Sequence, residues 1–113
     1  MFYSMKQFLR FYKEIYADEE MKPRINEISE AILKGEKIDS LYLIMLASNP
    51  VEQLDIYSYR MFRAALPHRR GDTLIVGMAA SKDSAMELVS MMVNDVCKTN
   101  NDYDLRKLFQ GSL

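Results

Sequence analysis

The spacing of apolar residues predicts two helices at the start of the chain. Residues 4–17 carry an apolar stripe with helical spacing, made of Met5, Phe8, Leu9, Tyr12 and Tyr16. A second helix is expected from about Pro23, because proline lacks only an N–H that a first turn leaves unpaired. Its apolar positions are Ile25, Ile28 and Ile32, and Gly35 is placed to end it in the left-handed conformation. Residues 1–35 are therefore predicted to form a helical hairpin.

Two short apolar segments predict buried strands. Residues 41–47 and 73–77 are apolar on both faces, as in a strand covered by helices on both sides. Asn49 and Pro50 predict the start of a helix between them, although the aromatic residues within 53–62 leave an extended structure open there. A strand, a crossover helix and a second strand favour a right-handed parallel unit. Two strands make a poor sheet, so we expect either a third strand in an ambiguous segment or the pairing of two chains.

The clearest helical pattern follows the second strand. Its apolar positions are Ala85, Leu88, Val89, Met92, Val93 and Val96. Ser84 and Glu87 have the spacing of a capping box, and Ser81 or Asp83 are alternative caps. Leu105, Leu108 and Phe109 suggest a short docking turn. The expected fold is α/β (or α+β): one domain over residues 1–113, with the helical hairpin at 1–35, a β-α-β-α unit at 41–109, and a small sheet covered by helices.

Composition narrows the class of protein. The 113 residues contain 15 Lys+Arg and 16 Asp+Glu, for a formal charge of -1, and 49% are hydrophobic. These are the values of a single globular domain, and the near-zero charge disfavours nucleic-acid binding. Cys97 is the single cysteine, which excludes an intramolecular disulfide and fits a reducing compartment. The apolar run at 41–47 is far short of the ~20 residues that a membrane-spanning helix needs. We therefore expect a cytoplasmic protein without membrane contact.

The region from about residue 41 to 109 resembles a group of small uncharacterised bacterial α/β proteins. The resemblance is carried by the segments 41–50, 54–57, 75–79, 83–89 and 101–105, which include Ser-Asn-Pro, Asp-Ile-Tyr and Val-Gly-Met-Ala motifs. The resemblance implies no activity, so no functional residue is transferred from it. Residues 1–35 lie outside it.

The sequence shows no motif for catalysis or metal binding. The one histidine, His68, lies in a loop rich in turn-forming residues, and Cys97 has no basic partner nearby in sequence. There is no Cys pair, no HExxH motif and no nucleophile-elbow motif. We expect a protein that is not an enzyme and that needs no cofactor.

The turn at residues 77–84 is the first candidate binding site. It leads from a strand into a helix, where unpaired N–H groups and the helix dipole suit an anion or phosphate. The candidate ligand-binding residues are Ser81, Lys82, Ser84 and Asn49, the last on the assumption that parallel strands end at the same edge. Ordinary helix capping by the serines is the alternative explanation.

Two further groups of residues suggest interactions. Tyr3, Phe8 and Tyr12 form an aromatic stripe suited to a partner, because tyrosine is enriched at interfaces. Arg60, Arg63, Arg69 and Arg70 form a basic cluster. The interpretation we favour is a non-catalytic interaction module that forms a homodimer through the sheet edge or the aromatic stripe. The alternatives are a sensor or enzyme accessory that binds a small anion at 77–84, and a regulator that binds nucleic acid through the arginines.

Overall fold

The computed structural model describes residues 9–46, 54–65, 73–100 and 104–109. They form a mixed α/β fold. In chain order, the elements are β1 (Leu9–Ala17), the 3-10 helix η2 (Lys22–Arg24), α1 (Ile25–Leu33), β2 (Tyr42–Leu46), β3 (Leu54–Ser58), α2 (Tyr59–Ala65), β4 (Thr73–Ala79), α3 (Lys82–Asn100) and α4 (Leu105–Leu108).

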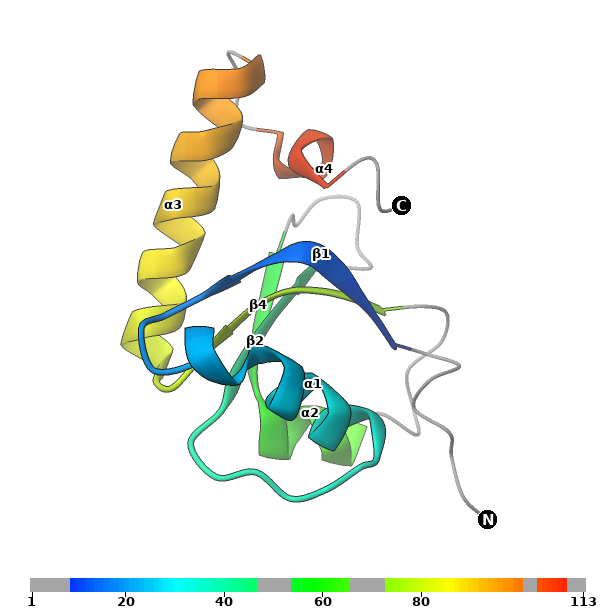
Figure 1. The fold of residues 1–113 in the computed structure, drawn as a ribbon. Helices are drawn as coiled ribbons and strands as arrows, with labels where there is room; N and C mark the ends of the chain where they lie inside the picture. The colour runs from blue at the N-terminus through cyan, green and yellow to red at the C-terminus, as the bar shows by residue number, and fades with distance from the viewer. Residues whose placement is uncertain (1–8, 47–53, 66–72, 101–103, 110–113) are drawn as a thin grey trace.

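The strands form one sheet between two layers of helices (Figure 1). The strand order is β1-β4-β2-β3; β1 and β4 run parallel, and β2 is antiparallel to both of its neighbours. The helices α1 and α2 pack on one face, and α3 and α4 pack on the other. This arrangement explains the apolar runs of β2 and β4, because both of their faces are buried.

The predicted helix over residues 4–17 is wrong, and with it the N-terminal helical hairpin. Residues 9–17 are a strand, while residues 1–8 lie outside the described residues. The odd positions of β1, such as Leu9 and Ile15, face α1 and α2, whereas Tyr12 and Tyr16 face α3 and α4. A strand with both faces covered places apolar residues at odd and even positions alike, and some of them fall at helical spacing by coincidence. Pairing with β4 and the aromatic content then favour the strand.

The predicted parallel pairing of the two apolar strands is also wrong, because β2 and β4 are antiparallel. The extended alternative for residues 53–62 is correct for 54–58, which form β3, and the helix predicted there is reduced to α2 at 59–65. Since β3 and β4 are both antiparallel to β2, they run in the same direction. A β-α-β connection therefore exists, but it runs from β3 through α2 to β4 and passes over β2.

Several local predictions are confirmed. Gly35 has a φ of 72°, and its N–H and that of Glu36 donate to the carbonyls of Ile32 and Ala31. These bonds form the cap that commonly ends a helix at glycine. The strand predicted at 41–47 is observed at 42–46, and the one at 73–77 extends to Ala79.

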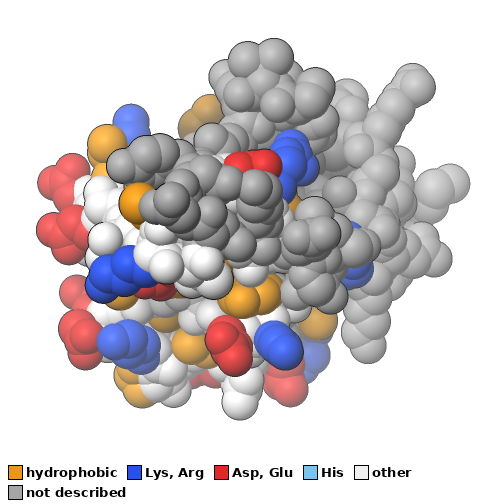
Figure 2. Space-filling model, turned by 90° about the horizontal axis from the view of Figure 1, so that it is seen from above, with side chains coloured by type: hydrophobic (Ala, Val, Ile, Leu, Met, Phe, Trp, Pro, Cys, Tyr) orange, Lys and Arg blue, Asp and Glu red, His pale blue; other side chains and the backbone are white. Residues whose placement is uncertain are grey.

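The surface of the described residues carries charges of both signs. On the face seen in Figure 2, acidic and basic side chains are interspersed over the described part, and neither sign gathers into one large field. Among the described helices, none has the length and apolar character that crossing a membrane requires.

Candidate functional site

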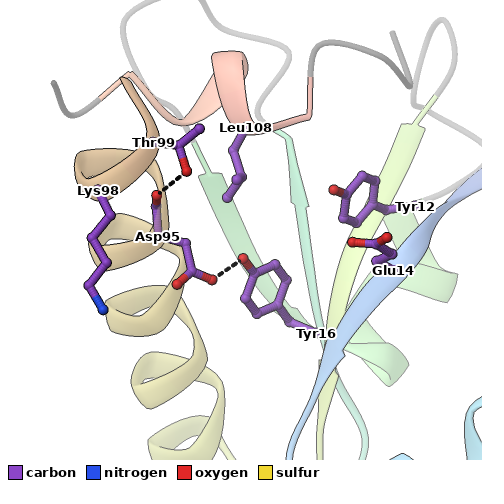
Figure 3. Close-up of a pocket in the computed structure, with 7 residues that line it drawn as sticks. All are labelled: Tyr12, Glu14, Tyr16, Asp95, Lys98, Thr99 and Leu108. Atoms are coloured by element: carbon purple, nitrogen blue, oxygen red, sulfur yellow. Dashed lines mark hydrogen bonds between the residues drawn. The ribbon is translucent and has the colours of Figure 1, made fainter. Parts of the chain in front are cut away.

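A cleft opens between β1 and α3, next to α4 (Figure 3). Its volume is about 330 Å³. The lining side chains come from β1, α3 and α4, and they are Tyr12, Glu14, Tyr16, Asp95, Lys98, Thr99 and Leu108. The two walls are far apart in sequence, so only the folded chain brings them together.

Strand alternation places one wall of the cleft. Tyr12, Glu14 and Tyr16 occupy every second position of β1 and so share the face that looks toward α3. The register against β4 shifts between Phe11 and Tyr16. These two residues are five positions apart in β1, but their partners Ile75 and Gly77 are only two positions apart in β4. This irregularity bends the strand away from a regular ladder, as β-bulges do near sites.

A hydrogen bond closes the inner end of the cleft. The hydroxyl of Tyr16 donates to Oδ2 of Asp95 at 2.5 Å, across 79 residues of sequence (Figure 3). Burial raises the pKa of Tyr16 well above 10.0, and the bond to Asp95 raises it further. Burial also raises the pKa of Tyr12, with a contribution from the nearby Glu14. Both phenols are therefore neutral donors at physiological pH.

The charges that line the cleft are not balanced. Glu14 is exposed to the cleft on one wall and Asp95 is half-buried on the other. Within the described part of the chain, neither carboxylate forms an ion pair. The amine of Lys98 lies on the outer side of α3 and points away from the tyrosines in Figure 3. The cleft thus presents two carboxylates beside two aromatic rings.

The turn at 77–84 is described, and the N–H groups of Ala80 and Ser84 already have partners within the chain. The N–H of Ala80 donates to Oδ2 of Asp18 at 2.7 Å, and the N–H of Ser84 donates to Oγ of Ser81 at 3.1 Å. The Ser81 hydroxyl also donates to that of Ser84 at 3.1 Å. Lys82 is exposed. The local geometry is that of a capped helix, with Ser81 as the cap among the alternatives considered.

Asn49 lies outside the described residues, but the strand that precedes it is described. Tyr42, at the start of β2, pairs with Ala79, at the end of β4. The chain therefore leaves β2 at the far end of the sheet from the 77–84 turn. The assumption that both strands end at one edge required parallel pairing, and the antiparallel register removes it.

The basic cluster is described in part, since Arg69 and Arg70 lie outside the described residues. Arg60 and Arg63 lie on α2, and the guanidinium carbon of Arg63 is 5.8 Å from the centre of the Tyr59 ring. Both arginines line a pocket of about 310 Å³ together with Lys37, Ile38, Asp39 and Tyr59. The loop before β2 thus adds Lys37 to the cluster, a residue that the sequence reasoning did not select.

The aromatic stripe is likewise described in part. Tyr3 and Phe8 lie outside the described residues, whereas Tyr12 lies on β1. The Tyr12 ring meets Phe109 edge to face, with 4.8 Å between centroids and an angle of 86°. Tyr12 therefore packs within the chain as well as lining the cleft. Cys97 is half-buried on α3.

Sequence reasoning missed Glu14, Tyr16 and Asp95 as residues of this cleft, and it did not select Asp18. No local motif marks Asp95, because its partner is 79 residues away. The sequence signal that could have found part of this site is strand alternation over residues 9–17. Treating this segment as a strand places Tyr12, Glu14 and Tyr16 on one face. The described residues gather no group of three or more His, Cys, Asp or Glu side chains suited to a metal ion.

Comparisons with protein-family models, curated proteins and solved structures found no match, so the resemblance of residues 41–109 to a bacterial group stays a prediction.

Proposed function

We propose that this protein is a non-catalytic interaction module that self-associates through the outer edge of β3. Within the described part of the sheet, β3 is an edge strand: it pairs with β2 on one side and has no strand on the other. An open edge presents unpaired N–H and C=O groups, which makes it a template for another strand. The observation that carries this proposal is the direction of the β3 backbone groups.

That direction follows from the pairing with β2. The N–H of Tyr59 donates to the carbonyl of Leu41 at 2.8 Å, one step beyond the pair Tyr42 and Ser58. Hydrogen-bonded and non-hydrogen-bonded pairs alternate along an antiparallel ladder. The backbone groups of Asp55 and Tyr57 therefore point toward β2. Those of the alternate residues, Leu54, Ile56 and Ser58, point outward.

The other edge of the sheet is less suited to pairing. β1 carries the register irregularity between Phe11 and Tyr16, and Arg10, Lys13 and Glu14 are exposed along it. Bulges and charged residues are the features that protect edge strands from adding another chain. Asp55 is the single charged residue in β3. The comparison of the two edges favours β3 as the contact.

A second copy of the chain fits this edge by symmetry. Antiparallel pairing about a two-fold axis at Ile56 sets Ile56 opposite its own copy and Leu54 opposite Ser58 of the second copy. Each such pair exchanges both of its outward hydrogen bonds. A hydrogen bond contributes about 1 kcal/mol net, and association costs roughly 4–15 kcal/mol. A strand this short therefore supports a weak, concentration-dependent dimer.

Proline at position 56 tests the proposal. Ile56→Pro removes an outward N–H while the ladder bonds of Asp55 and Tyr57 to β2 remain, since proline is tolerated where the N–H faces away from the ladder. Ile56→Ala is the matched control, because it loses side-chain packing but keeps the N–H. Sedimentation equilibrium should show dimers for the wild type and for Ile56→Ala, and monomers for Ile56→Pro, with equal circular dichroism. A wild type that stays monomeric up to its solubility limit would sink the proposal.

Self-association through the N-terminal aromatic stripe is a separate form of the same function. The double change Tyr3→Glu and Phe8→Glu alters no residue of β3. Loss of the dimer in that double variant, with the dimer of Ile56→Pro retained, would assign the contact to the stripe instead of the edge.

A second candidate function is the binding of a small anion, now at the pocket beside α2. Lys37, Arg60 and Arg63 face one carboxylate, Asp39, so the pocket has a positive balance. At the 77–84 turn, by contrast, Asp18 already takes the Ala80 donor. A thermal-shift titration with inorganic phosphate and with a nucleotide should show stabilisation that Lys37→Ala abolishes and Lys82→Ala leaves unchanged. If Lys82→Ala abolishes the stabilisation and Lys37→Ala leaves it unchanged, the anion binds at the 77–84 turn instead.

Nucleic-acid binding through Arg60, Arg63, Arg69 and Arg70 makes a different prediction. Binding of that kind weakens steeply as salt increases, because bound counterions are released. If the protein does not retard DNA or RNA in a gel-shift assay at low salt, nucleic-acid binding through these arginines is excluded.

A further inference from the structure

We propose that Asp55 selects the way in which two copies of this chain join at the β3 edge, an inference that rests on the self-association proposed above. Asp55 admits antiparallel pairing about a two-fold axis at Ile56, in which it lies opposite Tyr57 of the second copy. The same charge disfavours the other arrangements that this edge offers. Asp55 is thus a specificity-determining residue of the contact.

Asp55 carries a charge on a largely apolar face of the sheet. By strand alternation it shares the face of Tyr57, which packs against the core between the sheet and the helices α1 and α2. Its neighbour on β2 is Met45, which is fully buried and offers no hydrogen-bond donor from its side chain. The half-buried carboxylate of Asp55 has no hydrogen bond or ion pair with the other described residues. A residue of a second copy placed beside it therefore meets a charge that no described neighbour offsets.

The possible arrangements differ in what they place beside Asp55. A two-fold axis at Asp55 itself sets the two carboxylates opposite each other, and in-register parallel pairing sets them side by side. Like charges directly opposite are destabilising. An axis at Tyr57 avoids this repulsion but pairs only residues 56–58. The axis at Ile56 pairs all five residues of β3 and gives each Asp55 an uncharged neighbour, Tyr57 of the second copy.

A charge on the inner face of an edge strand is one of the features that prevent unwanted pairing. Asp55 is the single charged residue of β3, so it can block some arrangements and leave one open. In that arrangement the β3 edges of the two copies occupy each other. The expected product is a closed dimer in a single register.

Disulfide trapping reads the register without changing Asp55. In a Cys97→Ser background, the variants Leu54→Cys, Ile56→Cys and Ser58→Cys are oxidised singly with copper phenanthroline. The Leu54→Cys and Ser58→Cys proteins are also oxidised as a mixture. Hydrogen-bonded pairs place their Cα atoms about 5.5 Å apart, which is within the range of a disulfide.

The expected result is a covalent dimer from Ile56→Cys alone and from the mixture, but not from Leu54→Cys alone or Ser58→Cys alone. Adding Asp55→Asn should allow these two to cross-link singly, because parallel pairing then brings no charges together. Cross-links of Leu54→Cys alone while Asp55 is present would overturn the proposal. A cross-linking pattern that Asp55→Asn leaves unchanged would do the same.

Tyr57→Lys and Tyr57→Glu test the contact itself. The two variants lose the same packing and differ in the charge that they place opposite Asp55 of the second copy. Each dimer contains two such pairs, so Tyr57→Lys should dimerise at least about twofold more tightly than Tyr57→Glu. In an Asp55→Asn background this difference should disappear. With parallel pairing or an axis at Tyr57, position 57 meets its own copy, so equal weakening in both variants would contradict the proposal.

The outcomes distinguish this proposal from the self-association on which it rests. A wild type that stays monomeric contradicts both. A dimer that Ile56→Pro disrupts, combined with equal affinities of Tyr57→Lys and Tyr57→Glu, overturns the role of Asp55 alone. Circular dichroism verifies the fold of each variant, and the cysteine variants decide the register if the changes at position 57 prevent folding.

Discussion

The carboxylate of Asp18 binds the backbone N–H of Ala80 at 2.7 Å, although 62 residues separate the two. Its other oxygen accepts the N–H of Met21 at 2.9 Å. Asp18 follows β1 directly, and Ala80 follows β4, so the contact joins the carboxyl ends of the two parallel strands. The turn considered as a candidate anion site thus already binds a carboxylate supplied by the chain itself.

Asp18→Ala should lower the free energy of unfolding by about 1–3 kcal/mol, because it leaves two backbone donors without a charged acceptor. Guanidinium unfolding would measure the change. The control is Glu19→Ala, whose partner Lys22 lies at 3.0 Å on an exposed surface; such pairs contribute roughly 0–1 kcal/mol. If the two variants lose equal free energies of unfolding, the Asp18 contact does not stabilise the fold more than an exposed ion pair does.

Gly77→Ala should destabilise the sheet through overpacking. A Cβ at Gly77 would lie 2.9 Å from Cδ1 of Ile44 and 3.1 Å from Cε of Met92. Overpacked cores lose about 1–3 kcal/mol. Ile44→Val removes Cδ1, so in a double-mutant cycle the pair should cost less than the sum of the single changes. If the free-energy losses of Gly77→Ala and Ile44→Val simply add in the double variant, the strain at position 77 does not arise from contact with Cδ1 of Ile44.

Tyr16→Phe tests the bond to Asp95 through its pH dependence. The pKa of Tyr16 is raised above its ordinary 10.0 in the folded protein, first by burial and then by Asp95. The folded state therefore holds the proton more tightly than the unfolded state. The resulting stabilisation is complete below pH 10 and is lost progressively as the pH rises above it.

The wild type should exceed Tyr16→Phe in stability by about 1.5–3 kcal/mol at neutral pH, as for a hydrogen bond to a charged group. This difference should narrow between about pH 10 and pH 11. Thermal unfolding of both proteins across that range measures it. A difference that stays constant with pH would contradict the raised pKa, and Tyr57→Phe provides a tyrosine outside the cleft for comparison.

Elements whose signals are local can be predicted from the sequence alone. The period of Ala85, Leu88 and Met92 predicted α3, and all three are buried. Gly35 predicted the end of α1, because the left-handed conformation is a property of one residue and its neighbours. The two apolar runs predicted β2 and β4, since residues covered on both faces must be apolar throughout.

The pairing of the elements depends on contacts that form only when the whole chain folds. Leu9, Tyr12 and Tyr16 fit a helical stripe as well as a strand with two buried faces, and pairing with β4 selected the strand. The residues of β2 do not by themselves predict that it pairs antiparallel to β4, because strand direction depends on the path of the connecting chain. The contacts of Tyr16 with Asp95 and of Asp18 with Ala80 are longer-range still. No sequence pattern predicts either contact, because the paired residues come within hydrogen-bond distance only when the sheet and its helices have assembled.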